Sequence, residues 1–450
     1  MLLSLHYLSS YHSSVYTTLY PCDGCIEYIP FHMQWHNFFN DPYSSEIFNI
    51  SNPMYAVNGS SIDSLVVSYM RDDNGGKYFW VFNKSLRSAE DIVLNLNSGC
   101  SVADVLAHGR CTQNGSVAVT LQPGEAKLFR AFIENQLDTI KGNAVWNNMR
   151  LVGTTLVIDS MATLTVKDSL LFTPTARLIV RPGGKLLVDG GVLTSACEGG
   201  MWRGIEVMGN PGKRQEARHQ GYVDLKNGAV VENALCAVLT GLQGDNGANS
   251  GGIIKAINTT FRNNARGVNI LPYTYILPGG TVRGNIANFS YCNFIIDNDN
   301  NFSQNNTCFT EHVRLNDVSS VEFYSCSFSS GLLYNNLKTY RAIYAEDAGF
   351  IISKGCPDGL VFEDCVCPES FTPCNTFTGF NRAIEANTTG NQYEIRIDQS
   401  KFWRNGTGIK INGNNFVTVT RDSFDLTQGY GSRLGNRTGL FLNNCTGYKV

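Results

Sequence analysis

The stretch from Leu151 to Thr194 repeats itself after 22 residues, and this repeat constrains the fold more than any other feature of the sequence. Three leucines of the first repeat coincide with leucines of the second: Leu156 with Leu178, Leu164 with Leu186, and Leu171 with Leu193. Glycine, proline, aspartate or serine separates the apolar positions, which predicts three short strands and three turns per repeat. One such repeat cannot bury its own apolar face, so neighbouring repeats must stack into a solenoid.

Later repeats keep the three-strand pattern and add loops at its corners. A shift of 30 residues relates Val223 to Ile253, Val231 to Phe261, and Val238 to Val268. The additional residues include Gly241 to Gly247, a segment rich in glycine, asparagine and aspartate. The 22-residue shift then returns and relates Ile395 to Val417, Ile397 to Val419, and Phe402 to Phe424. Short β-branched runs favour strands over helices, and we expect one β-solenoid over residues 140–450.

A small residue followed by an apolar residue marks one corner of many repeats. The pairs are Gly204-Ile205, Ala237-Val238, Gly267-Val268, Ala342-Ile343, Ala383-Ile384, Gly408-Ile409 and Gly439-Leu440. The small residue lets one strand begin close to the end of another, and the apolar side chain after it should point into the core. We also expect Phe294 to stack on Phe328, with Cys292 and Cys326 buried beside them as small apolar groups.

The residues before the solenoid follow another pattern. Residues 53–135 contain short apolar runs separated by turn signals, which predicts a small antiparallel β-sandwich. Phe82 to Ser85 and Leu121 to Phe129 resemble the β-sandwich accessory domain that follows the catalytic barrel in many glycoside hydrolases. That resemblance implies a non-catalytic domain. Residues 1–52 have no clear period, and we expect a remnant of a preceding domain or an irregular segment.

Three motifs of the solenoid resemble the right-handed parallel β-helix repeat proteins that Bacteroidota secrete. They are Trp202 to Gly209, Val223 to Ala229, and Thr259 to Asn264. The resemblance implies an all-β fold, in which a right-handed parallel β-helix of three-strand coils covers residues 140–450. It also implies a secreted or cell-surface location. Because the pattern stops at Val450 in the middle of a repeat, we expect the helix to be truncated there.

Charge and hydrophobicity argue against two classes of partner. The formal net charge of −3 provides no general attraction to nucleic acid or to an anionic membrane surface. No run of eighteen apolar residues occurs, so no membrane-spanning helix is expected. The sequence indicates no oligomeric state.

No metal or cofactor site is predicted. Cys22 and Cys25 have CxxC spacing, but no second pair lies at the distance of a zinc finger. The cysteines at 356, 365, 367 and 374 favour a disulfide in a loop, because no histidine is near them in the sequence. Asp297 to Asn301 lacks the glycine and the distal glutamate of a calcium-binding EF-hand loop, so we expect a solvated loop there.

The corner pattern also predicts a candidate binding site. Sides alternate along a strand, so the residue after each inward apolar side chain should point outward. These outward residues are Glu206, Leu239, Asn269, Tyr344, Glu385, Lys410 and Phe441, and an arginine precedes the small residue at Arg203, Arg266, Arg341 and Arg382. In this register five of the residues lie together on adjacent coils: Arg341, Tyr344, Glu346, Arg382 and Glu385.

Those five residues are consistent with three roles. An aromatic ring beside arginines and carboxylates suits a sugar-binding groove, through ring stacking and bidentate hydrogen bonds. Two carboxylates near arginine could also carry out acid–base catalysis. A solvated sheet face with ion pairs between coils would contain the same residue types.

Two hypotheses on function follow. The first is a non-catalytic, secreted or cell-surface structural or binding module, with a polysaccharide or surface glycan as its partner. The second is a carbohydrate-active enzyme, a polysaccharide lyase or glycoside hydrolase, acting on the β-helix face or in a missing N-terminal domain. The chain has no Gly-His-Gly motif, and after residue 140 its only histidines are His219 and His312. This favours the first hypothesis, and we assign no catalytic residue.

Overall fold

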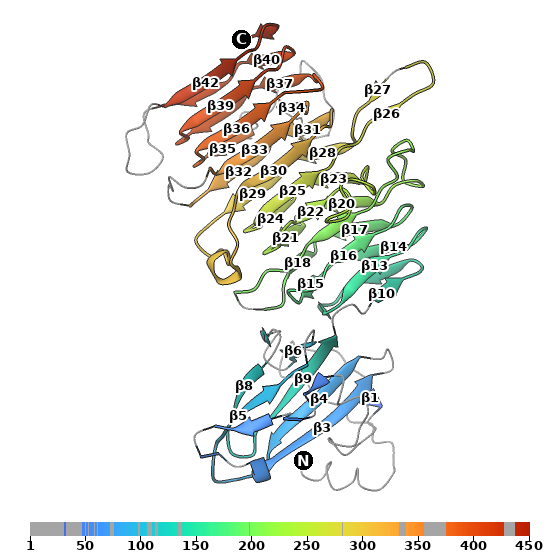
Figure 1. Ribbon diagram of the computed structural model, residues 1–450, viewed down its shortest axis with the longest axis vertical. Helices are drawn as coiled ribbons and strands as arrows, with labels where there is room; N and C mark the ends of the chain where they lie inside the picture. Colours follow the sequence, from blue (N-terminus) through green and yellow to red (C-terminus); the bar gives the residue numbers. More distant parts are fainter. Residues whose placement is uncertain are drawn as a thin grey trace. The chain divides into compact units, whose positions relative to one another are not determined.

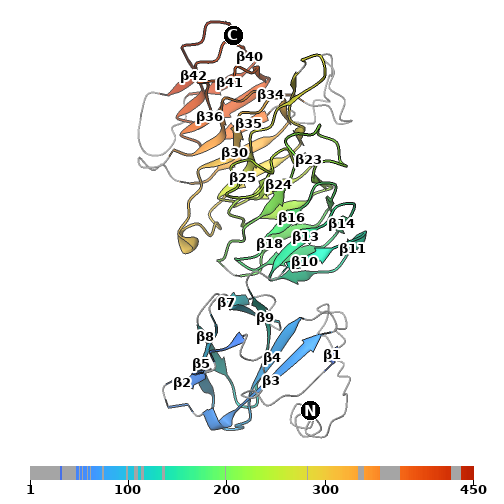
Figure 2. The same ribbon diagram turned by 45° about the vertical axis from the view of Figure 1, so that its right-hand side comes forward.

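The computed structural model describes residues 31–32, 47–49, 51–52, 54–57, 59–60, 62–72, 76–97, 100–105, 110–112, 116–133, 137–197, 199–280, 282–332, 339–354, 375–426 and 437–450. The chain divides into two compact units, one of Met1–Gln136 with Ala196–Glu198 and the other of Leu137–Ser195 with Gly199–Val450. Strands build both units (Figures 1 and 2). Within the described ranges the named helices are two 3-10 turns, η1 (Ile62–Ser64) and η2 (Ser303–Asn305).

The smaller unit is the expected antiparallel β-sandwich. Its six-stranded sheet has the order β1 (Phe31–His32), β3 (Leu65–Asp72), β4 (Lys77–Asn83), β9 (Ala126–Ile133), β6 (Cys100–Asp104) and β7 (Arg110–Thr112). Its three-stranded sheet has the order β2 (Met54–Ala56), β5 (Glu90–Asn95) and β8 (Ser116–Leu121). Phe79 and Phe129 of the first sheet share one buried core with Leu94 and Val119 of the second. β1 pairs with β3, so part of residues 1–52 extends this sheet.

The larger unit consists of three long parallel sheets that the chain visits in turn. Sheet 1 has the order β10 (Leu137–Ile140), β13 (Thr155–Ile158), β16 (Leu178–Val180), β19 (Ile205–Val207), β22 (Val238–Leu239), β25 (Arg266–Ile270), β30 (Glu311–Asn316), β33 (Arg341–Glu346), β36 (Arg382–Asn387), β39 (Thr407–Asn412) and β42 (Thr438–Asn443). Sheet 2 has the order β11 (Ala144–Trp146), β14 (Thr163–Val166), β17 (Lys185–Asp189), β20 (Tyr222–Lys226), β23 (Ile253–Ile257), β28 (Ala287–Ser290), β31 (Val321–Tyr324), β34 (Phe350–Ser353), β37 (Ile395–Asp398), β40 (Val417–Thr420) and β43 (Tyr448–Lys449). Sheet 3 has the order β12 (Arg150–Val152), β15 (Ser169–Phe172), β18 (Val192–Ser195), β21 (Val230–Glu232), β24 (Thr260–Arg262), β29 (Asn293–Ile296), β32 (Ser327–Ser330), β35 (Asn375–Thr378), β38 (Ser400–Trp403) and β41 (Ser423–Asp425).

This arrangement is a parallel β-helix, as the sequence predicts. Each strand pairs in parallel with the equivalent strand of the next coil, so the coils stack from β10 to β42 along the unit (Figure 1). A separate antiparallel hairpin, β26 (Tyr275–Ile276) with β27 (Val282–Arg283), extends from one corner. Core side chains of all three sheets form one continuous buried cluster, because every coil covers the apolar face of its neighbour.

Identical side chains stack along the inside of the helix. In sheet 3 the rings of Phe261, Phe294, Phe328, Phe377, Phe402 and Phe424 follow one another at 4.6–4.9 Å. The predicted pair Phe294–Phe328 is part of this series, and Cys292 and Cys326 are free and buried beside it. Offset aromatic pairs of this kind add to the free energy gained from apolar burial.

The predicted corner residues form a continuous ladder in sheet 1. Ile205, Val238, Val268, Val313, Ile343, Ile384, Ile409 and Leu440 pair in this order. Gly204 shows why the preceding residue is small: its φ is +105°, and a Cβ atom there would overlap the carbonyl oxygen of Cys236. The corner is therefore built by backbone packed directly on backbone.

Two of the expected registers are wrong by one residue. Leu170, not Leu171, pairs with Leu193 and is buried. Val166 pairs with Val188 and Ser169 with Val192, so the later coil has one more residue between these two positions. A one-residue slip sends every side chain to the other face. The second error concerns the 30-residue shift, because Val223 of β20 pairs with Ile254 of β23 and not with Ile253. Val231 still pairs with Phe261, so the connection from sheet 2 to sheet 3 is one residue shorter in the later coil.

Candidate functional site

The five predicted site residues lie together on the outer face of sheet 1. β33 and β36 are adjacent, with Arg341 opposite Arg382 and Tyr344 opposite Glu385. Glu346 ends β33 and lies opposite Asn387. The predicted register therefore holds at this point, since the inward residues Ile343 and Ile384 also pair.

Glu385 is the centre of the site, and it is only 3% exposed. Its Oε2 accepts a hydrogen bond from Nε of Arg341 at 2.6 Å, and its Oε1 lies 2.5 Å from Arg382 and 3.3 Å from Nζ of Lys410. Burial alone would raise the pKa of this carboxyl, but the hydrogen bonds from Arg382 and Arg341 outweigh burial and the net pKa is lowered. Glu385 is thus a fixed anion with both oxygens occupied.

Tyr344 and Glu346 form the second half of the site. The Tyr344 hydroxyl donates to Oε1 of Glu346 at 2.8 Å, and Arg314 donates to Oε2 of Glu346 at 2.7 Å. The guanidinium of Arg341 lies 4.4 Å from the centre of the Tyr344 ring, within the range of a cation–π contact. Burial, together with the bond to Glu346, raises the pKa of the Tyr344 hydroxyl. The ring and the guanidinium groups therefore hold one another in place.

The structure adds residues that the sequence reasoning missed, and most of them come from β30. Glu311 lies between Arg266 and Arg341 in the ladder and is 2% exposed. Its Oε1 is 2.6 Å from Arg266, and its Oε2 is 3.9 Å from Arg341. β30 was missed because His312 replaces the small corner residue that marks the other coils. The sequence could still have revealed β30, because apolar Val313 is followed by polar Arg314 and apolar Leu315, which is the alternation of a strand.

Over five successive strands of sheet 1, the outer face carries more positive than negative charge. In β25, β30, β33, β36 and β39 the charged residues are the cations Arg266, Arg314, Arg341, Arg382 and Lys410 and the carboxylates Glu311, Glu346 and Glu385. Five cations against three carboxylates leave two positive charges in excess. The Arg382 side chain is 36% exposed and that of Lys410 is 25% exposed, so part of this charge reaches solvent.

A row of polar side chains borders this charged strip. Asn316, Glu346, Asn387, Asn412 and Asn443 pair successively at the ends of five strands. Nδ2 of Asn412 donates to Oδ1 of Asn387 at 2.6 Å. The strip therefore offers cations, amides and one aromatic ring in a repeat set by the spacing of the coils, about 4.8 Å per strand.

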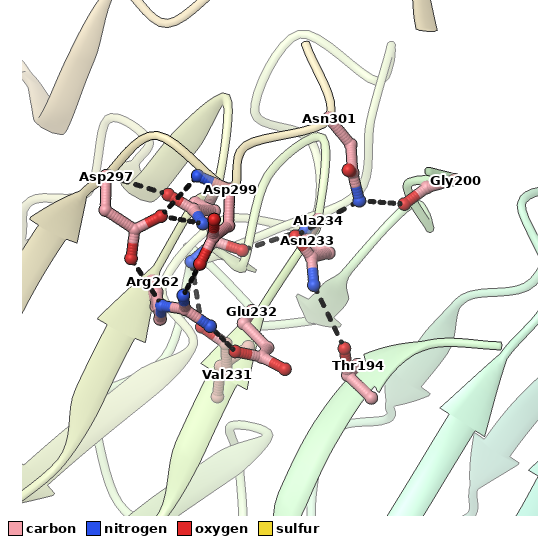
Figure 3. A network of polar contacts seen from close by, with 12 residues as sticks. Thr194, Gly200, Val231, Glu232, Asn233, Ala234, Arg262, Asp297, Asp299 and Asn301 are labelled. Carbon is pink, nitrogen blue, oxygen red and sulfur yellow. Dashed lines mark hydrogen bonds and ion pairs between the residues drawn. The ribbon is translucent and has the colours of Figure 1, made fainter. Parts of the chain in front are cut away.

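The acidic loop at Asp297 is closed by an arginine (Figure 3). Nε of Arg262 is 2.7 Å from Oδ2 of Asp297, and its terminal nitrogens lie 3.0 Å from Asp299 and 3.4 Å from Glu232. Hydrogen bonds from Asn263 and Arg262 outweigh burial and lower the pKa of Asp297. The carboxylates converge on a guanidinium, and within the described residues no group of histidine, cysteine, aspartate and glutamate could hold a metal ion.

The cysteines divide into described and undescribed sets. Cys22, Cys25 and the four cysteines between 356 and 374 lie outside the described residues. Six described cysteines are free, and Cys197 is disulfide-bonded. Among the described residues no helix is long and apolar enough to cross a membrane.

Comparison with known proteins adds no relative. No protein-family model, no curated protein and no solved structure matches the chain significantly. The fold is therefore established by the sheets themselves, and the resemblances noted from sequence motifs stay predictions.

Proposed function

We propose that the protein is a non-catalytic, secreted or cell-surface binding module that holds an anionic polysaccharide on the outer face of sheet 1. The excess of cations over carboxylates on β25 to β39 carries this proposal. Guanidinium groups bind carboxylate and sulfate groups through bidentate hydrogen bonds, and a regular row of them suits a polymer with repeating charges. The neighbouring amides can bond sugar hydroxyls.

The state of Glu385 supports binding over catalysis. A general acid must exchange its proton near the working pH, and a nucleophile needs a free oxygen. Glu385 has a lowered pKa, and Arg341, Arg382 and Lys410 occupy both of its oxygens. Glu346 likewise accepts from Tyr344 and Arg314. These carboxylates orient the cations that a ligand would meet.

The disulfide at Cys197 supports the proposed location. Disulfides persist in oxidising compartments and are rare in the reducing cytosol. A protein outside the cell also encounters polysaccharide directly, which fits the proposed ligand.

Affinity electrophoresis in gels that contain polygalacturonate or neutral dextran tests the proposal. We expect polygalacturonate to retard the protein, and Lys410→Gln to weaken that retention about threefold. Lys401→Gln is the matched control, because it removes the same charge from the exposed outer side of sheet 3. Equal loss in both variants, or no retention at all, would contradict the proposed surface.

A reducing-end assay on the same polysaccharide tests the non-catalytic part. We expect no release of new ends by the wild-type protein. Turnover that Glu385→Gln abolishes would overturn the binding-module proposal and favour the enzyme hypothesis. Binding without turnover would support it.

A further inference from the structure

A second candidate site lies at the corner between sheets 1 and 2, away from the charged face. It is a cavity of about 300 Å³. Its polar lining comes from the loop between β19 and β20, the segment after β25, and the strands β28 and β31. Its wall includes Arg214, Gln215, Tyr273, Asn285, Asn288 and Glu322. This volume is at the lower end of the range for small-molecule sites, about 300–1,000 Å³.

The wall of this corner pocket is rigidly built. Gln215 is buried, and its Nε2 donates to the carbonyl of Gly251 at 3.0 Å and to Oδ1 of Asn285 at 2.8 Å. Its Oε1 accepts from the backbone N–H of Ile286 at 2.6 Å. The Tyr273 hydroxyl donates to the carbonyl of Lys213 at 2.8 Å. Three separate segments are thereby tied together before any ligand arrives, which lowers the entropy cost of binding.

One buried group of the pocket lacks a partner. Asn285 is 2% exposed, and its Nδ2 makes no hydrogen bond with any described part of the chain. An unpaired buried donor costs about 1–3 kcal/mol, so a group of this kind in a pocket wall indicates that something else supplies the acceptor. Its Oδ1 is already bonded to Gln215, and the unpaired Nδ2 is itself buried, on a residue that forms part of the cavity wall.

The other polar groups define what could fill the space. Nδ2 of Asn288 donates to Oε2 of Glu322, and burial raises the pKa of that carboxyl. Arg214 reaches the same pocket with a side chain that is 54% exposed. Tyr273 adds an aromatic ring, which packs against the backbone of Gly251. Amides and a carboxyl suit hydroxyl groups, and an arginine suits a carboxylate.

We propose that this corner pocket binds a single sugar residue that carries a carboxylate, a hexuronic acid, with its carboxylate on Arg214 and its hydroxyls on Asn288 and Glu322. The pocket uses no residue of the sheet 1 face, so it is an additional site whose existence does not depend on the function proposed above. Its size fits one ring rather than a polymer.

Calorimetric titration with methyl galacturonoside, methyl galactoside and acetate tests the corner pocket. We expect methyl galacturonoside to bind, and methyl galactoside to bind about tenfold more weakly because it lacks the charge-assisted bond. Acetate should not bind at about 10 mM, because it offers no hydroxyl groups. Equal binding of the neutral sugar, binding of acetate at the same affinity, or no binding of the uronoside would each overturn the proposal.

Variants in the same loop make the test specific. Arg214→Gln should weaken methyl galacturonoside about tenfold and leave methyl galactoside unchanged. Arg218→Gln is the matched control, since Arg218 is 75% exposed, pairs with Glu216 as Arg214 does, and is not part of the pocket wall. Asn288→Ala should weaken both sugars. Loss of uronoside binding in Arg218→Gln, or retention of uronoside binding in Arg214→Gln, would contradict the assignment. Lys410→Gln, on the sheet 1 face, should leave uronoside binding to the corner pocket unchanged.

Discussion

Glu385 and His312 are both buried in the β-helix, but Glu385 is charged there and His312 is neutral. Glu385 stays charged because Arg341, Arg382 and Lys410 surround it. His312 has no charged partner among the residues that the structure describes. Burial lowers its pKa to about 3, and its ring lies within 4.7–6.2 Å of four phenylalanine rings. Its Nε2–H donates to the carbonyl of Ser329 at 3.1 Å, so it is buried as the neutral imidazole.

His312 should make the β-helix less stable in mild acid. Its folded pKa of about 3 lies below the unfolded value of 6.5, so between these values only the unfolded chain binds the proton. Stability is therefore complete above pH 6.5 and falls as the pH drops toward 3. His312→Ala, which restores the small residue of the other corners, should lower the urea midpoint at pH 7.5 and flatten its decline between pH 6.5 and 4. An unchanged pH dependence in this variant would show that other groups cause it.

At the scale of elements, short-range sequence features fix each corner, whereas the loop inserted after β29 is held by hydrogen bonds and ion pairs to earlier coils. The segment after β29 contains Asp297 and Asp299, which both bond Arg262 of β24 (Figure 3). Asn301 and Asn305 of the same segment donate to the carbonyls of Gly200 and Gly199. The loop is thus anchored on coils that precede it by about a hundred residues.

Removing the arginine should release this loop without unfolding the coils. In Arg262→Ala, Glu232, Asp297 and Asp299 lose their shared counter-ion, and their mutual repulsion should favour open loop states. Limited digestion with endoproteinase Asp-N should then cleave before Asp297 or Asp299 about tenfold faster than in the wild type. Arg181→Ala is the control, because its single exposed pair with Asp159 anchors no inserted loop. Equal cleavage rates in all three proteins would argue against the anchor.

At the scale of the whole molecule, the β-helix is a one-dimensional stack. Each strand inside the stack pairs with the equivalent strands of the coil before and the coil after. A destabilising mutation should therefore affect mainly the adjacent coils. The core is continuous along the stack, yet no side chain spans more than adjacent coils in the aromatic series of sheet 3.

This geometry predicts that core mutations act locally. Phe328→Ala should destabilise its region by about 3–5 kcal/mol and raise hydrogen exchange in β29, β32 and β35. Leu164→Ala, at an equally buried position, should raise exchange in β11, β14 and β17 instead. Exchange that rises throughout the β-helix in both variants would show a single cooperative unit and contradict the one-dimensional description.

The sequence by itself determined the three-strand coil, the core ladders and the cluster of Arg341, Tyr344, Glu346, Arg382 and Glu385. These follow from local periodicity, because stacking turns a repeated spacing directly into spatial neighbours. The same reasoning missed the coil of His312, where a ring fills the corner that glycine or alanine fills elsewhere.

Only the tertiary structure decided the rest. Whether Leu170 or Leu171 is buried depends on one residue in a turn, which periodicity averages away. The pairing of Glu385 with three cations depends on side-chain burial and direction. The corner pocket joins Gln215 to Asn285, which are separated by 70 residues of inserted loop and coil. Such contacts involve inserted segments of irregular length, which the repeat pattern of the sequence does not describe. Their residues become neighbours only when the coils pack.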